Sequence, residues 1–113
     1  MTKPGTIAAL VDLYYRSRKW NGLSEGSKRT YRYILEPFVA EHGHRRVDQM
    51  EAKHVDALMD AKVATPVAAN RLRKLLSVLM RIAIRQGWRK DNPVIAIENF
   101  KIRSKGHPHM DSR

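Results

Sequence analysis

Residues 65–87 read TPVAANRLRKLLSVLMRIAIRQG and decide the fold of this 113-residue chain. Threonine followed by proline is a typical helix start, and the closing glycine is a typical helix end. Between them, apolar residues recur at intervals of three and four, which indicates one long amphipathic helix. We expect it to run from Pro66 to about Gln86. Its apolar stripe comprises Leu72, Leu75, Leu76, Leu79, Ile82 and Ala83.

The polar side of this helix is basic and has no opposing carboxylates. From Ala61 to Lys90 the basic residues are Lys62, Arg71, Arg73, Lys74, Arg81, Arg85, Arg89 and Lys90. Many acidic residues gather upstream, at Glu41, Asp48, Glu51, Asp56 and Asp60. The whole chain has a formal net charge of +11. Positive charge that is also segregated favours binding to a polyanion, most commonly DNA.

Helical periodicity extends through the rest of the chain. A first helix is predicted from Thr6 to about Lys19, ended by a turn at residues 20–22. A second begins at Ser24 or Ser27 and ends at His42–Gly43, with a kink or an early end near Leu35 because Pro37 lies inside it. The anchors Val47 and Met50 precede a third helix over residues 51–62.

The region after the long helix is predicted to fold back on it. Trp88, Pro93, Val94, Ile95 and Ile97 would form a capping segment with one helical turn. The sequence therefore predicts an all-α domain, an orthogonal bundle of four helices with a C-terminal capping segment. We expect a disordered N-terminus over residues 1–5, one domain over 6–102 and a basic linker over 103–113.

Composition excludes several classes of protein. The chain has no cysteine, which rules out disulfides and thiolate zinc sites. The pairs His42/His44 and His107/His109 have a spacing that could bind metal, but with no cysteine and no nearby pattern of carboxylates a solvated surface explains them better. No signal peptide and no apolar run of about 20 residues is present, so we expect a soluble protein of the cytoplasm.

Three stretches resemble a known family: TIAALVDLY at residues 6–14, SKRTYRYIL at 27–35 and AIRQGWRKDNP at 83–93. Their order and spacing are similar to those of the core-binding (SAM-like) N-terminal domain of phage integrases, the tyrosine site-specific recombinases. Pro37 departs from the pattern, as does Glu51, which stands where the family often has a threonine at the start of the third helix.

The resemblance implies half of a C-shaped clamp around double-stranded DNA at an attachment site. The implied partners are a catalytic domain following in the same protein and other recombinase protomers in a synaptic complex. No metal or nucleotide cofactor is implied. In this family the nucleophilic tyrosine belongs to the catalytic domain, so the resemblance gives that role to none of Tyr14, Tyr15, Tyr31 and Tyr33. We expect this chain alone to be monomeric, and to bind DNA without cutting it.

The resemblance also directs the second and fourth helices toward DNA, so residues opposite their apolar stripes are candidate contacts. Asn70 and Arg73 suit base reading, because asparagine pairs with adenine and arginine with guanine in the major groove. Ser27 and Thr30 suit phosphates near a helix N-terminus. The remaining candidates are Lys28, Arg32, Arg71, Lys74, Ser77, Lys101, Arg103 and Lys105, with Arg29 nearby.

Simpler interpretations remain open for single residues. A solvated surface explains any one basic residue about as well as a DNA contact does, and Ser27 is more easily a helix N-cap. Arg81 and Arg85 are interpreted as solvated residues or as partners of the C-terminal helix dipole. The alternative functions are a helix-turn-helix regulator, a small basic RNA-binding protein and an amphipathic helix at a membrane surface; an enzyme complete in this chain is least favoured.

Overall fold

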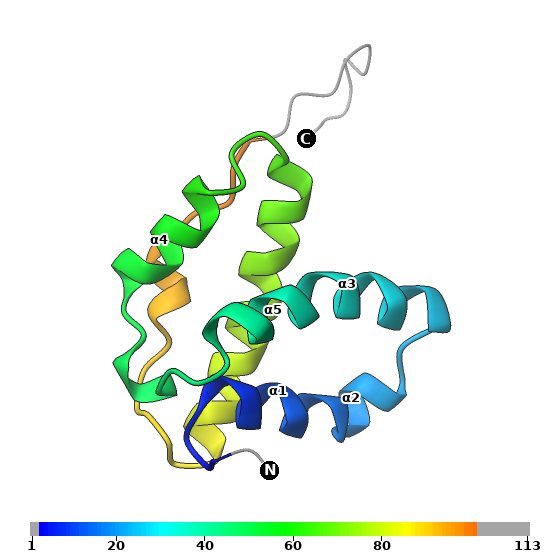
Figure 1. Cartoon of the computed structure of the whole chain (residues 1–113), viewed down its shortest axis with the longest axis vertical. Helices are drawn as coiled ribbons and strands as arrows, with labels where there is room; N and C mark the ends of the chain where they lie inside the picture. Colours follow the sequence, from blue (N-terminus) through cyan, green and yellow to red (C-terminus); the bar gives the residue numbers. More distant parts are fainter. Residues whose placement is uncertain (1–2, 102–113) are drawn as a thin grey trace.

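A computed structural model describes residues 3–101; the predicted DNA contacts Arg103 and Lys105, and the predicted linker over 103–113, lie outside that range. The described chain contains five α-helices and two 3₁₀ turns and no strands, which confirms the all-α prediction (Figure 1). In chain order the elements are α1 (Ile7–Tyr15), α2 (Arg18–Asn21), α3 (Glu25–His42), η1 (Val47–Gln49), α4 (Ala52–Asp60), α5 (Pro66–Arg85) and η2 (Pro93–Ala96).

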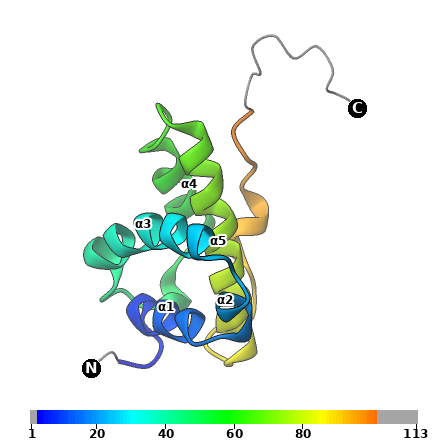
Figure 2. The same ribbon diagram turned by 90° about the vertical axis from the view of Figure 1, so that its right-hand side faces the viewer.

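Helix α5 lies at the centre of the molecule, as its long apolar stripe predicts. It packs against α1, α3, α4 and η2, and both views show it running through the middle of the fold (Figures 1 and 2). The prediction for its stripe is confirmed for all positions except Ile82, which is only partly buried. Its buried residues are Ala69, Leu72, Leu75, Leu76, Leu79, Met80 and Ala83.

The first predicted helix is two helices in the structure, so the prediction of one continuous helix to Lys19 was wrong. Ser17 separates them: its hydroxyl donates to the carbonyl of Tyr14 (2.6 Å) and accepts from the backbone N–H of Trp20 (3.1 Å). Serine favours such caps because its short side chain competes for backbone groups. Trp20, predicted as part of a turn, lies inside α2 and is buried beside the Tyr14 ring.

Helix α3 begins at the Ser24 cap, whose hydroxyl accepts from the Ser27 N–H at 3.1 Å. Of the two alternatives predicted at Pro37, a kink or an early end near Leu35, the early end was wrong, because the helix continues past Pro37 to His42. Proline removes one hydrogen bond from the helix, but Leu35 and Phe38 on either side of it are both buried in the same core. That shared burial keeps the two halves in one element.

The loop after α3 fastens α1 to the rest of the domain. The backbone N–H groups of Ile7 and Ala8 donate to the carbonyls of Arg45 and Gly43, each at 2.9 Å. Gly43 permits this approach, since a Cβ there would lie 3.2 Å from the Cβ of Ala8 in α1 and 2.5 Å from the Val39 carbonyl oxygen of α3. Val47 and Met50 are buried, as predicted for anchors of this connection.

Helix α5 ends as predicted at Gly87, which has φ +79°. The N–H of Gly87 donates to the Ile84 carbonyl (3.0 Å) and that of Trp88 to the Ala83 carbonyl (2.9 Å). This pair of bonds is a Schellman motif, which reverses the chain and favours glycine at the left-handed position. Residues 92–100, the return segment, then run back along α5 with Val94 fully buried. Across residues 3–101, every helix is too short or too polar to cross a membrane.

Candidate nucleic-acid interface

One polar side of α5 is covered by the return segment. The side-chain amide of Asn70 donates to the Phe100 carbonyl (2.9 Å), and its oxygen accepts from the Phe100 N–H (2.8 Å). Arg73 Nε donates to the Ile97 carbonyl, and Ser77 Oγ accepts from the Asn92 amide at 3.1 Å. Three predicted DNA contacts, at helical spacing on one side of α5, therefore bind the protein's own chain.

Arg89 is also used inside the fold, although the sequence counts it with the basic face. Its side chain is only 8% exposed. One terminal nitrogen donates to the carbonyls of Val47 and Met50, each at 2.8 Å, and the other pairs with Asp91 at 3.1 Å. This arginine joins the chain after α5 to the connection before α4, so its charge is not available to a partner.

A second polar side of α5 faces solvent. It carries Arg71, Lys74, Arg81 and Arg85, all exposed. Their separations of three, seven and four residues place them on one face of an α-helix. Within residues 3–101, none of the four forms a salt bridge. We call these four side chains the basic row; they place positive charge along one face of the central helix.

The candidates on α3 have different surroundings. Lys28 pairs with Glu25 at 3.5 Å and its side chain is only 16% exposed. The Arg32 guanidinium lies 5.3 Å from the centre of the Trp20 ring, a cation–π contact that directs it toward α2. Thr30 donates to the carbonyl of Gly26 at 3.1 Å, one turn earlier. Ser27 stands in the first turn, half-buried beside Ser24.

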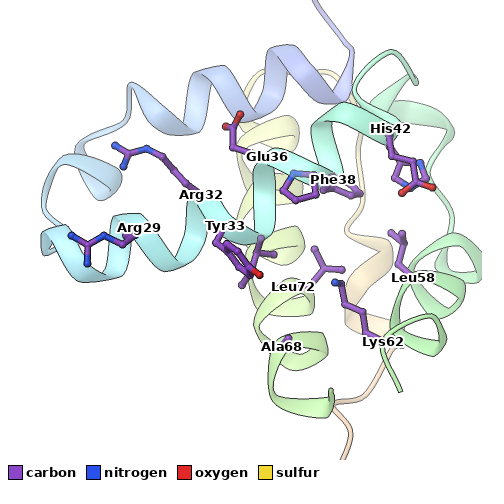
Figure 3. Close-up of a pocket in the computed structure, with 13 residues that line it drawn as sticks. Arg29, Arg32, Tyr33, Glu36, Phe38, His42, Leu58, Lys62, Ala68 and Leu72 are labelled. Carbon is purple, nitrogen blue, oxygen red and sulfur yellow. The ribbon is translucent and has the colours of Figure 1, made fainter. Parts of the chain in front are cut away.

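A groove between α3, α4 and α5 separates the α3 candidates from the start of α5 (Figure 3). Its floor is apolar and includes Phe38, Leu58 and Leu72. Arg29 and Tyr33 line it from α3, one turn apart on the same face, and Tyr33 is 83% exposed. The groove therefore joins exposed polar and aromatic groups of α3 to the N-terminal half of α5.

Two tyrosines of α1 serve the fold. Tyr14 is buried, and burial raises the pKa of its phenol. The Tyr15 hydroxyl donates to the Glu36 carboxylate at 2.8 Å; burial first, and then this hydrogen bond, raise the pKa of Tyr15. Both phenols therefore stay protonated at neutral pH. Among residues 3–101 no group of three metal-ligating His, Cys, Asp or Glu side chains is present.

Sequence reasoning left two members of the basic row out of the candidate site. Arg81 and Arg85 were interpreted as solvated or dipole-stabilising residues, because they lie late on the helix. Their spacing from Arg71 and Lys74 already places all four on one face, so helical periodicity applied to charged residues would have found them. No spacing in the sequence indicates that Arg89 is buried.

Comparison with protein families places most of the chain in one of them. The family described as the phage integrase central domain matches residues 8–99. A search of curated proteins gave no match.

Solved structures share the fold. A lambda integrase fragment, solved as a dimer bound to a COC′ core site, superimposes with a TM-score of 0.79 at 19% identity. The alignment covers 88% of this chain and 36% of that one, so the chain spans about a third of its length. The solution structure of a domain from a Nitrosospira multiformis protein, assigned as a phage integrase, gives a TM-score of 0.69 at 22% identity. There the alignment covers 96% of this chain and 100% of that domain.

Proposed function

This chain belongs to the phage integrase central domain family, and on that premise we propose that it binds double-stranded DNA through the basic row of α5. Two exposed groups of α3 that line the groove, Arg29 and Tyr33, would extend the contact, together with the half-buried Ser27 in the first turn of α3. The duplex at an attachment site would lie against these two helices. The domain would act there as one half of a clamp.

The observation that carries this proposal is the basic row itself. Four cations on one solvent-exposed helix face, with no salt-bridge partner in residues 3–101, repel one another unless a polyanion neutralises them. A row at helical spacing can meet successive phosphates, and phosphate contacts give affinity and register on a duplex. The integrase with the same fold was solved on a DNA core site, which supports DNA as the polyanion.

The same premise extends to the whole protein. We infer that the chain serves DNA integration or recombination, in which a separate catalytic domain cuts the DNA and further protomers complete the complex. Lambda integrase was solved as a dimer on its site, which supports protomers as partners. For this chain alone the proposal is binding without cleavage and without a cofactor.

The test is fluorescence anisotropy with labelled duplex DNA and duplex RNA of equal length, at several salt concentrations. We expect DNA to bind more tightly than RNA, with an affinity that falls linearly on a log–log plot against salt, because phosphate contacts release counterions. The double variant R71E/K74E should lower the steepness of that line by about two, since each phosphate contact contributes roughly 0.9.

The matched control for Lys74→Glu, one half of that double variant, is Lys53→Glu, which makes the same charge change at an exposed lysine of α4, outside the row. It should leave the salt dependence nearly unchanged. Equal losses in Lys53→Glu and Lys74→Glu would mean that net charge alone attracts DNA. Absence of DNA binding at low salt, or tighter binding to RNA, would contradict the proposal.

A further inference from the structure

The contact between Asn70 and Phe100 uses the side-chain groups with which an asparagine could contact DNA. Both the N–H and the carbonyl of Phe100 pair with the Asn70 amide, at 2.8 and 2.9 Å. An asparagine amide uses the same donor and acceptor when it reads the edge of adenine. The backbone of Phe100 thus occupies both groups that base reading would need, and Asn70 cannot contact a base without releasing it.

The rest of the return segment is held firmly. Val94 is fully buried, Ile97 and Phe100 pack against the core, and Arg73 donates to the Ile97 carbonyl. Beyond Ile97, the hydrogen bonds from a side chain to the backbone of the segment are the two made by Asn70. Asn70 therefore makes the side-chain hydrogen bonds that, together with the packing of Phe100, fix the last described part of the chain against α5.

Lys101 follows Phe100 directly and is exposed. Consecutive Cα atoms are about 3.8 Å apart, so holding Phe100 at Asn70 also holds Lys101 beside the N-terminal half of α5. Arg71 adjoins Asn70 in the helix, and Lys74 lies one turn further along. The charge of Lys101 is thereby brought to the end of the basic row where Arg71 and Lys74 stand.

We propose that Asn70 is a positioning residue for DNA binding: it holds Phe100 on α5 so that Lys101 adds a fifth phosphate contact to the basic row. The inference rests on the proposed function, because it needs the row to bind DNA. It replaces the expectation that Asn70 reads a base. Asn70 raises affinity by reducing the freedom that Lys101 would lose on binding.

The hold on Phe100 is tested first, without DNA, by amide hydrogen exchange. In the native protein the Phe100 N–H should be protected, and in Asn70→Ala it should exchange at least tenfold faster. Asn70→Asp keeps an oxygen that can accept from this N–H and should retain part of the protection. Val94 should show unchanged exchange in both variants, which would establish that the domain stays folded. Rapid exchange at Phe100 in the native protein would overturn the inference.

The link to DNA is tested by a double-variant cycle on duplexes of random sequence, where base reading contributes little. Asn70→Ala and Lys101→Ala should each weaken binding about three- to tenfold at low salt, the value of about one phosphate contact. In the Lys101→Ala background, Asn70→Ala should have no further effect. A loss that persists in that background would mean that Asn70 contacts DNA itself, and would overturn the inference.

A second variant separates the two roles while leaving Asn70 in place. Phe100→Pro removes the N–H that Asn70 accepts. If Asn70 positions Lys101, this variant should weaken binding as Asn70→Ala does. If Asn70 reads bases, releasing it should leave affinity unchanged or raise it. A native protein that protects Phe100 but binds no DNA would refute the proposed function and this inference together, whereas normal binding with unprotected Phe100 would refute the inference only.

Discussion

The two polar sides of α5 have opposite uses. One side, at Asn70, Arg73 and Ser77, is covered by the return segment and bound to it through side-chain hydrogen bonds. The other side, the basic row, is exposed, and within residues 3–101 it has no ion-pair partner. The difference shows that a basic residue on an amphipathic helix is available to a partner only where the tertiary fold leaves its side chain exposed.

Arg89 gives the largest expected effect on the covered side. Arg89→Ala would leave the Met50 carbonyl without a donor and the Val47 carbonyl with only the Met50 N–H at 3.2 Å, and hydrogen bonds to a charged group contribute more than neutral ones. We expect the free energy of unfolding to fall by about 2–4 kcal/mol, measured by urea denaturation. Arg81→Ala on the exposed row is the control and should change it by less than about 0.5 kcal/mol. Equal losses of unfolding free energy in Arg89→Ala and Arg81→Ala would show that covered and exposed arginines contribute alike to stability.

Gly87 determines whether the chain after α5 can return at all. Its φ of +79° is unfavourable for a residue with a Cβ, so Gly87→Ala should lower the free energy of unfolding by about 1–2 kcal/mol. Gly26 provides a control of opposite sign, because it lies in α3, where an added Cβ would meet only the Ser24 hydroxyl oxygen, at 4.0 Å. Gly26→Ala should raise stability by up to about 1 kcal/mol. Thermal or urea unfolding of both variants measures this, and a neutral Gly87→Ala would show that the return segment tolerates another turn.

The smallest expected effect is on DNA affinity, and it tests whether the whole length of the basic row contacts DNA. Arg81→Ala and Arg85→Ala should each weaken binding to duplex DNA severalfold and lower the salt dependence by about one, with stability nearly unchanged. Ser77→Ala, on the covered side of the same helix, should leave the salt dependence as it is. If Arg71 and Lys74 matter but Arg81 and Arg85 do not, DNA contacts only the N-terminal half of α5.

Much of the fold could be predicted from local sequence. The start of α5 at Thr65–Pro66, its end at Gly87 and nearly all of its apolar stripe follow from capping chemistry and periodicity. The errors arose where side chains override those rules. Ser17 caps a second short helix that the apolar pattern hides, and burial on both sides of Pro37 carries α3 through a residue that usually ends a helix.

The candidate site was less accessible to prediction, for a physical reason. The sequence does show that α5 is basic, but Asn70, Arg73 and Ser77 meet residues 15 to 30 positions later in the chain. Periodicity describes one helix at a time, so it cannot show which of two polar sides a later segment will cover.

The sequence by itself therefore determined an all-α domain with a central amphipathic helix and a concentration of positive charge, because helix propensity, capping and periodicity act over a few residues. Only the tertiary structure decided how that charge is divided. Arg89 is buried and donates to carbonyls of the connection before α4, and Arg73 donates to a carbonyl of the return segment. Arg71, Lys74, Arg81 and Arg85 remained outside, because no other part of residues 3–101 folds over them.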